Sequence, residues 1–168
     1  MSLDATIGGA SSDSYITVAA SDTYHSNHLY ATAWTGASTD DKEKALKMAT
    51  RILDERLSWI GDKHTEAQAL RWPRSSVRDK DGYSVATTEI PTDITNATAE
   101  FARHLISSDL TAASEGKGIG GIKADKINVK FNAGDRLDVL PEIVREMIGH
   151  WGALSTGRGG IGVARVIR

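Results

Sequence analysis

The chain has 168 residues, 40% of them hydrophobic and 25% charged, which fits one ordinary domain with its own core. It contains no cysteine, so a disulfide framework and a thiolate metal site are both excluded. No run approaches the ~18–20 apolar residues of a membrane-spanning helix, and the first residues lack the pattern of a signal peptide. We therefore expect a soluble protein that is made in a cytoplasm and has no membrane partner.

The formal net charge of −2 is distributed unevenly along the chain. Residues 1–41 contain five aspartates and no lysine or arginine, whereas from Gly149 onward the formal charges are those of Arg158, Arg165 and Arg168. An acidic front and a basic tail can pair head to tail between copies, face different partners, or be two ordinary solvated ends. The near-neutral total is not that of a dedicated nucleic-acid-binding domain, which is usually strongly basic.

The first third of the chain predicts an arm followed by a short helix. Residues 1–13 are small, polar and rich in glycine and serine, which is typical of a flexible N-terminal arm. Thr17 is the expected N-cap of a short helix that continues to about Leu29. Trp34 then falls in a connector.

Two amphipathic helices are the strongest structural signals. The first, from Lys42 to Leu57, follows a capping run at 38–41 and carries apolar residues three and four positions apart. The second begins at Pro91 and continues to about Ala113 with the same spacing. We expect the two apolar faces to pack together. Four aromatic residues are assigned to the structural core: Trp34, Trp59, Trp72 and Phe101.

The segment 68–91 between these helices predicts a fixed, non-helical connector. Pro73 removes a backbone donor and biases Trp72 toward extended geometry, while Asp81-Gly82 is a turn pair. Upstream of it, we expect Gly61 to end the preceding helix in a left-handed conformation and residues 65–70 to form a helical turn.

Several motifs in and around this connector occur in a characteristic order. They are Y-I-T-V-A-x-x-D-x-Y-H at 15–25, D-K-E-K-A-L-x-x-A-T-x-x-L-D at 41–54, Q-A-L-x-W-P-R at 68–74, D-x-D-G-Y at 79–83 and E-I-P at 89–91. In this order they resemble the head–tail connector (adaptor, or head-completion) proteins of tailed bacteriophages, whose members are often labelled DnaT-like single-strand DNA-binding proteins. The resemblance covers residues 14–110 and is loose beyond Ser114.

The resemblance implies a structural role. Such a protein is a subunit of a homo-oligomeric ring, twelvefold in assembled virions of the family, in the neck between head and tail. The ring sits beneath the portal protein and presents a surface to the stopper, tail-completion or tail-tube protein. Genomic double-stranded DNA passes through the channel, so we expect contact with it to be weak and independent of sequence.

Residues 114–140 open with a glycine-rich run and continue into an alternating pattern that predicts a β-hairpin. One two-stranded ribbon is not stable alone in water, so we expect it to pair with a neighbouring copy or a partner. The inter-subunit candidates in this loop are Ile122, Lys126, Ile127, Val129, Lys130 and Phe131.

Residues 141–168 predict a helix from Glu142 to about Leu154, followed by a basic arm that can add to a partner as a strand. The candidate contacts with the portal or with a neighbouring subunit are Arg145, Trp151, Arg158, Val163, Arg165, Val166, Ile167 and Arg168. The match to the connector family is loose in this part of the chain.

The sequence predicts neither an enzyme nor a cofactor or metal site. Two G-x-G-x-x-G matches, at 116–121 and 157–162, lack the strand and helix of a dinucleotide fingerprint and are interpreted as linkers. His25 and His28 share one helix face but have no third ligand at a suitable spacing. The carboxylates at 79 and 81 are explained by a turn, because the distal glutamate of a calcium loop is missing.

Single-strand DNA binding of the DnaT-like kind is the alternative function. Arg71, Arg74 and Arg78 flank Trp72 and are the possible DNA-facing residues, with phosphates bound by the arginines and a base stacked on the indole. Structural arginine ion pairs and a buried tryptophan explain the same pattern.

The predicted fold class is mainly α. It comprises a flexible N-terminal arm (1–13), a helical core (14–113), a glycine-rich loop with a projecting β-hairpin (114–140), and a C-terminal helix with an extended arm (141–168).

Overall fold

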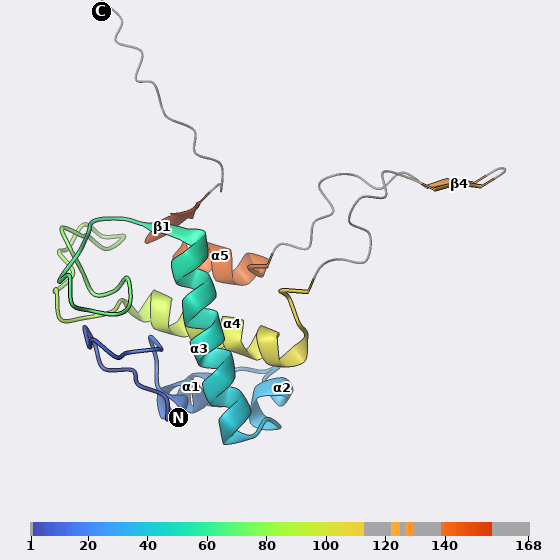
Figure 1. The fold of residues 1–168 in the computed structure, drawn as a ribbon, viewed down its shortest axis with the longest axis horizontal. Helices are drawn as coiled ribbons and strands as arrows, with labels where there is room; N and C mark the ends of the chain where they lie inside the picture. Colours follow the sequence, from blue (N-terminus) through green and yellow to red (C-terminus); the bar gives the residue numbers. More distant parts are fainter. Residues whose placement is uncertain (1, 113–121, 125–126, 130–138, 156–168) are drawn as a thin grey trace, which may run out of the picture.

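The computed structural model describes residues 2–112, 122–124, 127–129 and 139–155, and it confirms a mainly-α domain with short antiparallel strands (Figure 1). The helices are α1 (Val18–Ser26), α2 (Thr32–Thr35), α3 (Thr39–Arg56), α4 (Thr92–Ser107) and α5 (Glu142–Ile148). The strands are β1 (Leu57–Trp59), β2 (Asp62–Lys63), β3 (Arg74–Ser75), β4 (Ile122–Ala124), β5 (Ile127–Val129) and β6 (Gly152–Leu154). None of the described helices is long and apolar enough to span a membrane.

Helices α3 and α4 cross at the centre of the domain, as their apolar spacing predicts (Figure 1). The Ser38 hydroxyl accepts a hydrogen bond from the Asp41 N–H at 3.2 Å, so α3 starts at Thr39, three residues before the predicted start. The apolar residues of both helices are buried against each other. Those that are buried in this way are Ala45, Leu46, Ala49, Ile52, Leu53, Ile94, Ala97, Phe101 and Ala102.

The N-terminal elements are better defined than the sequence predicts. Thr17 caps α1 by accepting from the Ala20 N–H at 3.1 Å, as predicted, but the helix ends at Ser26. Trp34 lies in the single turn of α2, and its indole donates to the Asp22 carboxylate at 2.8 Å. Residues 2–13, expected to be a flexible arm, form a closed loop in which the Asp13 N–H donates to the Asp4 carbonyl at 2.8 Å.

Helices α3, α4 and α5 all end earlier than predicted, and a small sheet takes the place of the predicted ends of α3 and α5. The prediction of helix through Leu57 and through Leu154 is wrong: β1 pairs antiparallel with β6, with Leu57 opposite Leu154 and Trp59 opposite Gly152. A Cβ atom on Gly152 would lie 3.1 Å from the Ser58 carbonyl oxygen, so a larger residue would disturb this close approach. Helix α4 ends at Ser107 because Ser108 is extended.

The connector between β1 and α4 has one predicted feature and lacks another. Gly61 has a positive φ of 69°, as expected, but it joins β1 to β2 rather than ending a helix. Residues 65–70 do not form the predicted helical turn. Instead the side-chain amide of Gln68 accepts from the Thr65 N–H and donates to the carbonyls of Leu70 and Pro73, which follows a cis peptide bond.

The predicted β-hairpin is confirmed at backbone level. β4 and β5 pair antiparallel with Ile122 opposite Val129, and Figure 1 draws them apart from the helices. The other candidates of this loop and of the basic arm lie outside the described residues: Lys126, Lys130, Phe131, Arg158, Val163, Arg165, Val166, Ile167 and Arg168.

Candidate functional site

The tryptophan proposed as a base-stacking surface is inside the core. The Trp72 side chain is 1% exposed and lies edge-to-face between Trp59 and Trp151, with ring centroids 6.0 and 5.9 Å apart. Trp34 and Phe101 are fully buried as well. A base cannot stack on Trp72 unless this cluster opens.

Trp151, named above as a partner contact, is a core residue in this structure. It is 4% exposed, and its indole N–H donates to the Asp93 carboxylate at 3.1 Å. Helix α5 ends at Ile148, before Trp151, and the chain that follows carries the indole into the core. The predicted helix continued to about Leu154 and did not determine which way the indole would face. Arg145 is half-buried on α5.

Arg74, named above as a possible DNA-facing residue, is also structural. Its guanidinium is buried, at 9% exposure, and donates to the carbonyls of Ile60 at 2.6 Å, Arg71 at 3.2 Å and Gly61. Backbone carbonyls, rather than the carboxylate of an ion pair, therefore satisfy this charge. Arg71 and Arg78 remain exposed, so two of the three candidates are on the surface.

Replacing Arg74 with lysine tests this assignment. Lysine keeps the charge but cannot reach several carbonyls in one plane, so we expect the free energy of unfolding to fall by about 1.5–3 kcal/mol. Urea denaturation followed by circular dichroism measures the change. Arg78→Lys is the matched control and should change stability by less than about 0.5 kcal/mol. Equal effects of the two substitutions would contradict a structural role specific to Arg74.

A half-buried carboxylate joins three segments of the core. Asp54 on α3 accepts hydrogen bonds from the Tyr15 hydroxyl, from the Trp59 indole at 3.1 Å and from the Arg71 N–H at 3.1 Å. Burial raises the pKa of Asp54 in spite of these donors. It borders a hollow of about 520 Å³ lined by both acidic and basic side chains. Because its three donors come from Tyr15, Trp59 and the backbone of Arg71, Asp54 holds these segments together, and we assign it a structural role.

A second buried charge cluster lies between α1 and α4. Glu100 is 2% exposed, and its carboxylate accepts hydrogen bonds from the Arg103 guanidinium. His104 Nε2 lies 3.3 Å and His28 Nε2 3.6 Å from the same carboxylate. His25, one turn before His28, is 1% exposed and its Nε2 is 3.1 Å from the Ala99 carbonyl oxygen. In the described residues no group of three or more His, Asp or Glu side chains has the geometry of a metal site.

These groups predict a loss of stability in acid. Burial lowers the pKa of His25, and burial together with Arg103 lowers that of His104. Burial alone would raise the pKa of Glu100, but the hydrogen bonds and charge of Arg103 hold it below its ordinary value. Below pH 6.5 the unfolded chain therefore binds more protons at the histidines than the folded chain does, and at lower pH the same holds for Glu100.

Urea denaturation between pH 7 and pH 5 measures this dependence. We expect the free energy of unfolding to fall as the pH drops below 6.5, and to fall less steeply in His25→Gln, which removes one of the buried titrating groups. The exposed His64→Gln is the control and should keep the slope of the parent chain. A slope that is unchanged in His25→Gln would contradict the assignment.

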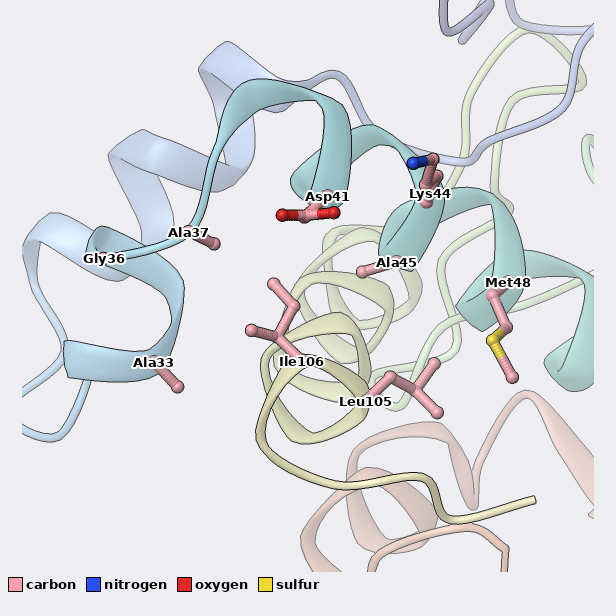
Figure 2. A pocket seen from close by; sticks show the side chains of 9 residues that line it. All are labelled: Ala33, Gly36, Ala37, Asp41, Lys44, Ala45, Met48, Leu105 and Ile106. Atoms are coloured by element: carbon pink, nitrogen blue, oxygen red, sulfur yellow. The ribbon is translucent and has the colours of Figure 1, made fainter. Parts of the chain in front are cut away.

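A groove opens at the other end of the domain, where the start of α3 faces the end of α4 (Figure 2). It has a volume of about 410 Å³. Its lining is mostly small or aliphatic, with Asp41 and Lys44 at the edge: Ala33, Gly36, Ala37, Asp41, Lys44, Ala45, Met48, Leu105 and Ile106. The described part of the chain leaves this groove open, which makes it a candidate contact surface.

Sequence reasoning missed both the charge cluster and the groove. The spacing of Glu100, Arg103 and His104 at i, i+3 and i+4 was available as a signal for the cluster. The groove has no such signal, because its lining comes from three elements and depends on where α4 ends.

These features define a small mainly-α domain with a packed aromatic core, buried polar clusters and an open groove with a mostly small or aliphatic lining. The chain belongs to the family described as "Putative DnaT-like ssDNA binding protein", whose model matches residues 1–168. No curated protein and no solved structure matches the chain significantly.

Proposed function

We propose that this protein is a structural, non-enzymatic subunit of a phage head–tail connector ring. In this proposal it docks beneath the portal in the virion neck and links the portal to the stopper, tail-completion or tail-tube protein, while DNA passes through the channel. Copies of the chain form the ring by repeating one head-to-tail contact, which needs no symmetry within the monomer.

One observation carries this proposal: residues of the motifs that resemble the connector proteins lie in the core and form its hydrogen bonds. Tyr15 and Asp54 are hydrogen-bonded to each other, Asp22 holds the Trp34 indole, and Gln68 folds the connector. Trp72 and Arg74 are buried. Motif residues that build the core support a fold shared with the connector proteins whose sequences these motifs resemble.

Capture by a cognate portal ring tests the proposal. Full-length protein mixed with portal rings should co-sediment with them and add a coaxial layer in electron micrographs. Full-length chain with Arg158, Arg165 and Arg168 all changed to alanine should bind more weakly, since the arm would lose its charge. Absence of the parent chain from the portal sediment would refute the proposal.

Single-strand DNA binding is the second candidate, and the family description favours it. Arg71 and Arg78 are exposed and can contact phosphates. If this function holds, an oligonucleotide should bind the isolated protein with strong salt dependence, and Arg71→Ala with Arg78→Ala should weaken it. We expect only weak binding, because Trp72 is not available for stacking.

A further inference from the structure

The open groove is shaped for a narrow aliphatic segment. Its side walls at Ala33, Ala37 and Ala45 carry only methyl groups, so a guest chain can approach the backbone closely (Figure 2). Leu105 and Ile106 of α4 provide the larger apolar surface. Branched aliphatic side chains would gain most from burial in such a groove, at about 25 cal/mol per Å² of apolar surface.

The mouth of the groove carries the carboxylate of Asp41, for which no ion pair is recorded in the described part of the chain. The Asp41 carboxylate lies opposite Ile106 in Figure 2 and accepts a hydrogen bond from the Ser38 hydroxyl at 2.7 Å. Lys44 forms its ion pair with Asp40, so its charge is already engaged. A guest segment with positive charges beside its aliphatic residues is therefore favoured over an acidic one.

One segment of this chain has that composition. Residues 156–168 carry three arginines and no acidic residue, interspersed with Ile161, Val163, Val166 and Ile167. We use the name C-terminal arm for these thirteen residues. They combine aliphatic side chains for the groove with positive charge for its mouth.

The arm departs from the end of the domain opposite to the groove. The Ser155 N–H donates to the Arg56 carbonyl at 2.7 Å, which fixes the departure point beside the C-terminal end of α3. The groove is lined by Asp41 and Ala45, which lie near the N-terminal end of the same helix. With a rise of 1.5 Å per residue, about 17–23 Å of helix separates the two. Thirteen extended residues span up to roughly 43 Å, which is enough to cross to another molecule.

We propose that the C-terminal arm of one copy docks into the groove of the next copy. The departure point of the arm and the groove lie at opposite ends of α3. Each copy can therefore extend its arm at one end and receive the arm of a neighbour at the other. Such a heterologous contact repeats until the ring closes. This inference rests on the proposed ring function and names the contact that would build the ring.

The absence of cysteine allows a direct test by disulfide cross-linking of full-length chains. Val163→Cys in the arm is mixed with Ala37→Cys in the groove, and separately with Ala86→Cys on an exposed loop as the matched control. Oxidation followed by non-reducing electrophoresis should give several-fold more heterodimer with Ala37→Cys than with Ala86→Cys. The yield should rise with protein concentration.

Two results would overturn the inference. The first is equal cross-linking at the groove and at the control position. The second is a double variant, Ala37→Cys with Val163→Cys, that closes only within one chain at every concentration, which would place the arm in its own groove. Portal capture is measured separately, so a ring that binds the portal without this cross-link refutes the arm contact and leaves the connector function standing.

Discussion

Replacing Trp72 with alanine should lower the free energy of unfolding by about 3–5 kcal/mol, the largest single effect that we expect. The indole is almost fully buried and contacts Trp59 and Trp151, so truncation removes buried apolar surface and leaves a cavity between two rings. Urea denaturation followed by far-ultraviolet circular dichroism measures the change without relying on tryptophan fluorescence.

Tyr83→Ala is the control for this substitution. Tyr83 lies in the same connector and is 74% exposed, so its loss should cost less than about 0.5 kcal/mol. If Trp72→Ala retained the stability of the parent chain and lost only binding to single-stranded DNA, the buried position assigned to Trp72 would be wrong.

Changing Glu100 to glutamine should cost about 3 kcal/mol of stability at pH 7. Breaking a buried ion pair leaves the partner charge without compensation, which typically costs 3–5 kcal/mol. We place Glu100→Gln at the lower end of that range because the Arg103 side chain is 15% exposed and is partly solvated. Thermal or urea denaturation measures the difference.

Glu55→Gln is the matched control, because Glu55 lies at i+4 from Arg51 with both side chains mostly exposed. An exposed pair of this kind contributes about 0–1 kcal/mol. A Glu100→Gln variant no less stable than Glu55→Gln would show that the cluster between α1 and α4 does not stabilise the fold.

The long helices could be predicted from sequence because their signals are local. Ser38 is a cap, and the apolar residues of α3 and α4 recur at the helical period. Strands β1 and β6 could not be predicted in this way, because β1 forms only by pairing with β6, almost a hundred residues later. Leu57 and Trp59 continue the apolar pattern of α3, and nothing local indicates that the period changes there.

The sequence could not predict how exposed the side chains of the candidate site are. Arginines beside a tryptophan are typical of a strand-binding surface and also of a packed connector. Arg74 is buried against the carbonyls of Ile60 and Gly61 in the turn after β1, and tertiary structure brings those carbonyls to it. The segment 1–13 is expected to be a flexible arm, and its described residues differ from that prediction for a similar reason: Asp13 forms an ion pair with Lys47 of α3 at 2.8 Å.

The measurement that tests the central claim most directly is electron microscopy of portal rings mixed with the full-length protein, in competition with single-stranded DNA. The connector account predicts coaxial rings of this protein on the portal, with occupancy that excess oligonucleotide does not reduce. Bare portal rings, with the protein retained on the oligonucleotide instead, would contradict the account and favour DnaT-like strand binding.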